Sequence, residues 1–243
     1  MGEELKLLVR TSSPYTLRIV WALKLKGLEY DTVYEEHSLA YESSLLLEEI
    51  NSPIHKNLPV LLIHGGKLIA EPLVILEYID EVWKQNPLLP QDPYQRAVAR
   101  FWVKFAEDKV LPSTKNAFVW GDMREEAIGK ALDNWKLLEE ELKGKRFFGG
   151  ESVGIVDIVV GWIAFSLTAM EEMVGPRLVT QERFPLLSKW IAEFSSAPII
   201  SENWPSVDQI RRRFYESHPL PQTQPQAEFH DYNYEHARFE AYK

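Results

Sequence analysis

The sequence predicts an α/β domain followed by an all-α domain, and three observations support this prediction. Short apolar runs alternate with helical patterns over residues 1–83. A stretch with three prolines, residues 84–93, then interrupts every periodic pattern and reads as a linker. Over residues 94–218 the apolar side chains recur at helical spacing, without the alternation typical of strands.

The first domain opens with a buried strand and a helix. Leu5–Val9 is a short apolar run that ends before a Thr-Ser-Ser-Pro cluster, as a strand followed by a turn would. Pro14–Lys26 carries a full set of helix signals, because Ser13 precedes a proline at the first helical position and Gly27 follows the last turn.

The rest of that domain is expected to continue as strand, helix, hairpin and helix. A His-Gly-Gly turn between two short apolar runs predicts the hairpin, and the final helix has a continuous apolar face. A β-α-β unit followed by a hairpin and a helix is the order of thioredoxin-like domains. The expected bounds are Tyr30–Tyr34, Ser43–Ile50, Val60–Ile63, Lys67–Ala70 and Pro72–Val82.

The second domain is expected to be helical throughout. Its most apolar stretch, Ile155–Met170, is interrupted by Asp157, Gly161 and Ser166, which favours a helix buried in a protein core over a membrane span. Residues 219–243 start Pro/Gln-rich and continue with aromatic and charged residues, so we expect an extended or mobile tail. The expected helices are Tyr94–Val110, Arg124–Lys143, Gly154–Val174, Phe184–Ser195 and Val207–Ser217.

Composition excludes several classes of function. The chain is 45% hydrophobic and carries a formal net charge of −9, so it would repel nucleic acid and anionic lipid. It has no cysteine, which excludes disulfides, a cysteine nucleophile and cysteine-based metal sites. The charged start predicts no signal peptide, and no apolar run is long enough for a membrane span. We therefore expect a cytoplasmic protein.

A series of short motifs spreads over residues 5–217, in an order and spacing that make chance agreement improbable. The motifs are Ser13-Pro14-Tyr15 with Arg18, Ala22-Leu23, Lys26-Gly27, His55–Val60, Ile69–Glu71, Asn86–Pro90, Asp92–Ala97, Arg100–Trp102, Phe147–Gly150 and Gly154–Ile158. Together they resemble the motifs of plant tau-class glutathione transferases. The tail from Pro219 lies outside this resemblance.

The resemblance implies a fold, a co-substrate and an assembly. It implies a thioredoxin-like domain that binds glutathione and a helical domain that holds a hydrophobic acceptor. Glutathione would be a co-substrate, and no metal would take part. It also implies a homodimer in which the first domain of one subunit contacts the helices of the other.

Ser13 is the candidate catalytic residue. A free thiol has a pKa of about 8.5, so glutathione is activated by any group that favours its thiolate. A hydroxyl at the start of a helix can donate to the sulfur, and the helix dipole adds to the effect. On local sequence alone Ser13 reads as an N-cap before Pro14, whereas the resemblance makes it the catalytic serine, with Ser12 as the nearest competitor.

Five residues are candidates for holding glutathione: Lys56, Asn57, Leu58, Glu71 and Pro72. The resemblance implies that Pro59 is cis, which would turn the Leu58 backbone toward the peptide-like middle of glutathione. An X-Pro bond taken alone would more often be an ordinary trans turn. The resemblance also implies that Glu71 holds the cationic γ-glutamyl end, and Lys56 can meet the glycine carboxylate.

The chain departs from the family pattern at three positions for glutathione. Glu42 and Asn57 stand where the family carries lysines, and Pro72 stands where it carries serine. The lost cations would have met the glycine carboxylate, and the lost hydroxyl the γ-glutamyl carboxylate. If each contact contributes about 1 kcal/mol, affinity falls more than about a hundredfold, and Lys56 compensates in part.

A further departure lies near the acceptor. Arg10 occupies a position that is usually apolar or aromatic in the family, and Lys115 aligns with a family cation. We therefore expect an acceptor or ligand that is hydrophobic and carries an acidic group, unless Arg10 simply faces solvent at a strand end. The expected apolar walls are Tyr15, Leu111, Phe118 and Trp162.

Asp157 has an expected structural role. Gly154–Asp157 resembles the start of a buried helix in the family. We expect the carboxylate to accept bonds from exposed backbone N–H groups there.

Two functions are compatible with these residues. The first is an enzyme that adds glutathione to hydrophobic electrophiles, or uses it in an isomerisation or a peroxide reduction. Ser13, Leu58 and Glu71 favour it. The alternative is a transferase-like carrier of acidic hydrophobic molecules with a weakened glutathione site. Glu42, Asn57 and Pro72 favour it.

Overall fold

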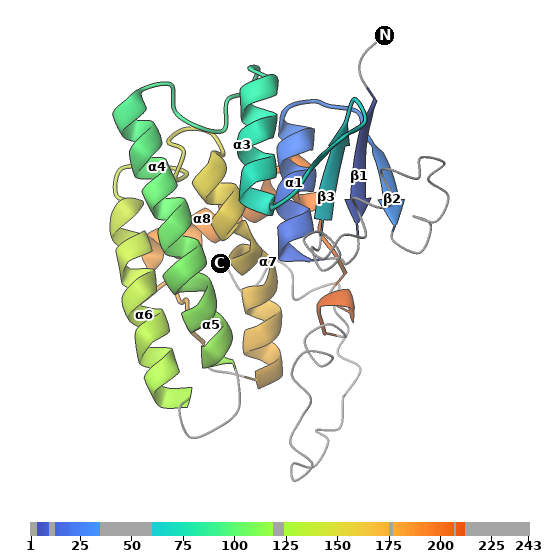
Figure 1. The fold of residues 1–243 in the computed structure, drawn as a ribbon. Helices are drawn as coiled ribbons and strands as arrows, with labels where there is room; N and C mark the ends of the chain where they lie inside the picture. Colours follow the sequence, from blue (N-terminus) through green and yellow to red (C-terminus); the bar gives the residue numbers. More distant parts are fainter. Residues whose placement is uncertain are drawn as a thin grey trace.

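Among the described residues, four strands form a mixed sheet in the order β2-β1-β3-β4 (Figure 1). β1 (Leu5–Val9) pairs parallel with β2 (Asp31–Tyr34) and antiparallel with β3 (Val60–His64). β3 forms a hairpin with β4 (Lys67–Ile69). This arrangement is that of a thioredoxin-like domain and confirms the predicted fold of the N-terminal domain.

The structure is a computed structural model that describes residues 4–9, 13–34, 60–118, 124–174, 177–206 and 208–211. The predicted helix Ser43–Ile50 and the predicted tail 219–243 lie outside them. Within the described ranges, no helix combines the length and the apolarity that crossing a bilayer requires.

Helices α1 (Pro14–Leu25) and α3 (Pro72–Val82) lie between the sheet and the helical domain (Figure 1). Side chains alternate along β1, so Leu5, Leu7 and Val9 share one buried cluster with the two helices. Residues of the opposite sheet face form a second, smaller cluster. Both helices have a proline in the first turn, as the sequence predicts, because an N–H is not needed there.

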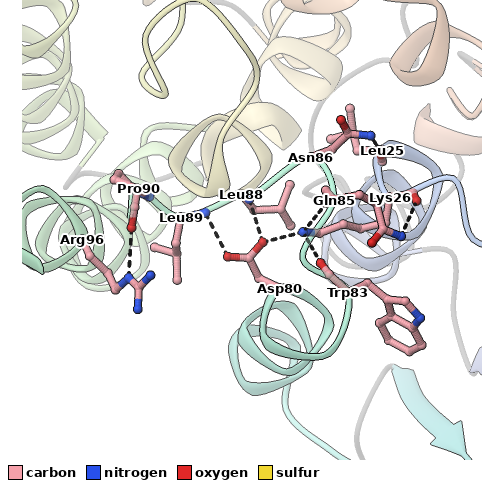
Figure 2. A network of polar contacts seen from close by, with 10 residues as sticks. All are labelled: Leu25, Lys26, Asp80, Trp83, Gln85, Asn86, Leu88, Leu89, Pro90 and Arg96. Carbon is pink, nitrogen blue, oxygen red and sulfur yellow. Dashed lines mark hydrogen bonds and ion pairs between the residues drawn. The ribbon is translucent and has the colours of Figure 1, made fainter. Parts of the chain in front are cut away.

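The linker is fixed to the first domain by a buried ion pair (Figure 2). Lys26, which caps the C-terminal end of α1, contacts Asp80 on α3, and its other acceptors are the backbone carbonyls of Trp83, at the end of α3, and Gln85, in the linker. Asp80 in turn accepts hydrogen bonds from the N–H groups of Leu88, at 2.7 Å, and Leu89, at 3.1 Å. The acceptors of Lys26 Nζ are Asp80 Oδ1 at 2.6 Å, Trp83 O at 2.7 Å and Gln85 O at 2.9 Å.

The second domain is all-helical, as predicted. Its helices are α4 (Pro93–Phe105), the π-helix η2 (Ala106–Val110), α5 (Leu111–Ala117), α6 (Arg124–Glu141), α7 (Ile155–Val174), α8 (Pro185–Ser196) and α9 (Pro198–Ser201). The first predicted helix continues seven residues beyond its expected end at Val110, as α5. Of the last predicted helix, Val207–Ser217, only residues 208–211 are described, and they are helical.

Helix α7 runs through the core of this domain, and Asp157 fixes its start as predicted. The buried carboxylate accepts four hydrogen bonds of 2.8–2.9 Å, so all of its acceptor positions are used. The donors are Phe148 N, Gly149 N, Gly154 N and Trp190 Nε1. The predicted buried helix is therefore confirmed, and its start is tied to α8.

Candidate active site

Ser13 lies at the N-cap of α1 and is 3% exposed. Its Oγ accepts a hydrogen bond of 3.1 Å from the Thr16 N–H and lies 3.3 Å from Thr16 Oγ1. The local prediction of an N-cap is thus observed. Capping uses only a lone pair of the oxygen, so the hydroxyl hydrogen can still be donated to a ligand at the positive end of the helix.

Tyr15 follows in the first turn of α1 and is half-buried. The Arg18 guanidinium lies 5.0 Å from the centre of its ring. Burial raises the pKa of Tyr15, the charges of Glu107 and Glu71 raise it further, and Arg18 lowers it. Residues from α1, η2 and the start of α3 therefore share one electrostatic environment.

A buried ion pair between the two domains lies behind this turn. Arg18 Nη2 is 2.7 Å from Glu107 Oε1 and donates a 2.8 Å hydrogen bond to the Val159 carbonyl on α7. The Arg18 side chain is fully buried, and its Nε and Nη1 find no acceptor within the part of the chain that the structure describes. A charge held with so few partners is stabilised mainly by Glu107.

Sequence reasoning missed this pair. Arg18 counted only as part of a motif, and Glu107 was not singled out. A signal was present, because Glu107 sits among Val103, Ala106 and Val110 on the buried side of its helix, where an acid needs a partner. The partner itself lies far away in sequence and could not be identified.

Glu71 has a strained backbone at the start of α3. Its φ of 71° and ψ of 119° fall in a region that side chains other than glycine rarely adopt. Such strain costs about 1–3 kcal/mol and is concentrated at functional sites. The exposed carboxylate caps no N–H of α3, so its charge faces outward.

Pro72 follows as the first residue of α3. Proline in place of the family's serine removes a side-chain hydroxyl. It removes no backbone hydrogen bond, because the N–H group at this position has no partner within the helix. The first turn of α3 therefore keeps its positive end beside Glu71.

Seven residues singled out in the sequence lie outside the described residues, and their roles stay predictions. They are Arg10, Ser12, Glu42, Lys56, Asn57, Leu58 and Pro59. Of the residues predicted to act on glutathione, the structure therefore describes Ser13, Glu71 and Pro72.

The predicted acceptor residues fall into two groups. Leu111, Phe118 and Trp162 are buried members of the main core, against which Tyr15 packs. Lys115 lies exposed near the end of α5. Of these residues, Tyr15 and Lys115 offer accessible surface, whereas the side chains of the other three are buried in the core.

The arrangement suits an anion beside Ser13 and a cation beside Glu71. A hydroxyl at a helix N-terminus favours negative charge, and a strained, outward-facing carboxylate favours positive charge. Among the described residues, no group of three His, Cys, Asp or Glu side chains could hold a metal ion.

Two family models match the chain. The model for the glutathione S-transferase N-terminal domain matches residues 3–81, and that for the C-terminal domain matches residues 104–198. A probable glutathione S-transferase of Glycine max is 46% identical over 220 residues, covering 88% of this chain and 96% of that protein. Glutathione S-transferase U7 of Arabidopsis thaliana is 44% identical over 209 residues, covering 86% and 90%.

Solved structures agree with the sequence relatives. A tau-class glutathione S-transferase from mango, Mangifera indica, superposes with a TM-score of 0.75 at 34% identity, covering 86% of this chain and 96% of that one. The rice enzyme GST1, solved in complex with glutathione, gives a TM-score of 0.73 at 29% identity, covering 88% and 95%.

Proposed function

Because this chain belongs to the glutathione S-transferase family, in its tau class, we propose that it joins the sulfur of glutathione to hydrophobic electrophiles. Ser13 carries this proposal, since its hydroxyl lies buried at the start of α1 and can donate its hydrogen to a ligand when Thr16 is the donor in their shared contact. The alternative of a non-catalytic carrier is not favoured, because relatives at 46% and 44% identity over most of the chain are named transferases.

Ser13 stabilises the thiolate without becoming a nucleophile. The thiol proton passes to solvent, and the sulfur then bonds to the electrophile while the leaving group departs with its electron pair. Lowering the thiol pKa by about two units requires about 2.7 kcal/mol. A hydrogen bond to a charged group contributes about 1.5–3 kcal/mol, and a helix N-terminus about 0.3–1 kcal/mol. The two together are sufficient.

Titration of bound glutathione by ultraviolet absorption of the thiolate tests this role. We expect the wild-type complex to ionise well below the free thiol, and Ser13→Ala to return the curve by about one to two pKa units. Ser12→Ala is the matched control and should keep the wild-type curve. Coinciding curves for wild type and Ser13→Ala would remove Ser13 from the mechanism.

Glu71 is proposed to bind the γ-glutamyl ammonium. Its carboxylate faces outward, and its strained backbone holds it beside the first turn of α3. The N–H groups of that turn suit the neighbouring carboxylate of glutathione. Lys56 and the Leu58 backbone complete the proposal for the rest of the tripeptide, with Asn57 in place of a family lysine.

The acceptor is proposed to be hydrophobic with an acidic group. Arg10 and Lys115 supply positive charge, and Tyr15 supplies an aromatic surface beside Ser13. Arg10→Leu should reduce the preference for acidic over neutral acceptors in a competition assay. An unchanged preference would discard the hypothesis.

A homodimer is proposed through α3 and α4. Val74 and Phe101 are exposed to 56% and 60%, and Tyr94 at the start of α4 to 72%. Arg100 and Glu77 form a two-pronged ion pair between the helices, at 2.9 and 2.6 Å. An apolar face of this kind, bordered by charges, is typical of a protein interface. We also propose a cytoplasmic location and a role in detoxification, in line with the cysteine-free sequence.

A further inference from the structure

Three aromatic side chains, those of His64, Tyr78 and Trp83, form a cluster outside the site of Ser13. His64 is the last residue of β3 and pairs with Leu5 at the start of β1, whereas Ser13 follows the other end of β1. The cluster and Ser13 therefore lie at opposite ends of the sheet.

The alternation of side chains along β3 turns His64 toward α3. Leu62 belongs to the core cluster that the sheet shares with the helices, and side chains two residues apart point to the same face of a strand. The ring of His64 accordingly meets two residues of the second half of α3 and its end. Its centre lies 5.9 Å from that of Tyr78 and 4.9 Å from that of Trp83.

A short hydrogen bond joins the imidazole to the phenol. His64 Nδ1 lies 2.6 Å from Tyr78 Oη. A phenol has a pKa of about 10 and is a stronger acid than the N–H of a neutral imidazole, so the phenol is the donor and Nδ1 the acceptor. A hydroxyl whose proton can move to an adjacent base has the arrangement of an activated nucleophile.

Trp83 keeps the imidazole in this orientation. Its ring lies against that of His64, and its backbone carbonyl accepts a 2.7 Å hydrogen bond from Lys26 Nζ. Lys26 is itself buried and paired with Asp80, so Trp83 is fixed from both α1 and α3. The base of the pair is thus oriented by a third group, as in other nucleophilic sites.

The cluster can be reached from solvent. The three rings are half-buried, and Val82, which follows Tyr78 by one turn on the same side of α3, is 42% exposed. Partly exposed aromatic rings offer an apolar surface on which another flat ring can stack. The surroundings of the phenol therefore suit a reagent that carries an aryl group.

We propose that Tyr78 is a modification site that takes an acyl group from activated aryl esters, with His64 as the general base. The phenol oxygen bonds to the ester carbonyl carbon while its proton passes to Nδ1. The bond from that carbon to the aryl oxygen breaks, and the electron pair leaves with the aryloxide. His64 then releases the proton to solvent, and the product is an ester of Tyr78. This reaction needs no glutathione and goes beyond the proposed function.

Acetylation of the full-length protein by para-nitrophenyl acetate, without glutathione, tests the proposal. Samples are quenched with acid, and peptide mass spectrometry gives the acetylation rate of each tyrosine. Tyr94 is the control within the same molecule, because it is 72% exposed and, within the described ranges, forms no hydrogen bond through its hydroxyl. General-base assistance contributes about 10²–10⁴-fold, so Tyr78 should react at least about tenfold faster than Tyr94 although it is less exposed.

Two variants separate the nucleophile from the base. His64→Gln removes the base and keeps a polar side chain, so it should lower the acetylation rate of Tyr78 by about tenfold or more and leave that of Tyr94 unchanged. Tyr78→Phe should abolish the label at this position and leave the conjugation of glutathione unchanged.

Equal acetylation rates at Tyr78 and Tyr94 in wild type overturn the proposal, and so does a Tyr78 rate that His64→Gln does not change. If His64→Gln does not fold, the wild-type reaction in heavy water takes its place. Proton transfer to His64 should slow acetylation of Tyr78 there relative to Tyr94, and equal slowing refutes the role of the base. Failure of the proposed transferase function leaves these outcomes unaffected, because no glutathione is present.

Discussion

Asp157 and Glu171, both on α7, show how burial and hydrogen bonding change the pKa of a carboxyl group. Burial raises the pKa of Asp157 and of Glu171, and the hydrogen bonds that they accept oppose the shift. Asp157 uses both oxygens for four donors. Glu171 uses Oε1 alone, which accepts from Leu178 N at 2.7 Å and Val179 N at 3.3 Å. The single oxygen of a glutamine side chain could therefore accept the bonds made by Glu171. The single oxygen of an asparagine could not accept all four bonds made by Asp157.

We expect Glu171→Gln to remove part of the pH dependence of stability. A carboxyl with a raised folded pKa holds its proton more tightly in the folded chain. Its contribution to stability is greatest below the unfolded pKa and is lost as the pH rises through the folded pKa. Urea unfolding between about pH 4 and pH 7 should therefore show wild type losing stability relative to the variant as the pH rises.

The exposed neighbour Glu172 on the same helix provides the control for that measurement. Glu172→Gln should reproduce the wild-type pH profile. A difference between wild type and Glu171→Gln that is constant across this range, or that favours wild type at higher pH, would contradict the expectation.

Single residues were predictable where a local signal exists. Ser13 precedes a proline and a helical pattern, so its N-cap position follows from the sequence. The strained φ of Glu71 and the pairing of Arg18 with Glu107 depend on contacts between segments far apart in the chain. No local pattern encodes such contacts.

Helices and strands followed the apolar periodicity closely. β1 and α3 have the predicted bounds, and the other described elements differ from the predictions mainly at their ends. The extension through η2 into α5 was missed, because Pro112 normally ends or bends a helix. Backbone widening and hydroxyl donors from the following residues let the helix continue there.

Helix α7 packs too closely for a side chain at Gly161. A Cβ built there would lie 2.5 Å from Phe194 Cζ and 3.0 Å from the Trp21 ring. We expect Gly161→Ala to lower the free energy of unfolding by about 1–3 kcal/mol, measured by urea unfolding.

Gly129 on α6 is the matched control, because nothing lies within 4 Å of its added Cβ. Gly129→Ala should be neutral or should stabilise the protein by about 0.5–1 kcal/mol, since alanine favours helix. Equal effects at the two positions would show that close packing is not the cause.

At the scale of the whole molecule, the order of the two domains was predictable from the proline-rich stretch and the change in periodicity, and the family models confirm that order. The contacts that join the domains were not predictable from the sequence, because Arg18, Glu107 and Val159 come from three distant segments. The assembly of two copies stays a prediction.

Phe101→Glu tests that assembly, because it places a charge in the exposed apolar face of α4. We expect wild type to be a dimer by light scattering and the variant to shift toward monomer, since burying an unpaired carboxylate is costly. Leu137→Glu, which changes an exposed residue of α6, should leave the dimer intact. A monomeric wild type, or a dimer unaffected by Phe101→Glu, would reject the α3–α4 interface.

The side chains of Lys26 and Asp80 bind main-chain atoms at the end of α3 and in the linker. A different linker that follows the same path can therefore keep these backbone contacts, although it loses the hydrogen bonds that Gln85 and Asn86 donate to the carbonyls of Lys26 and Leu25. Residues 84–93 are consequently a suitable junction for chimeras. In such a chimera, the helical domain of another protein would be held to this N-terminal domain by the same backbone contacts.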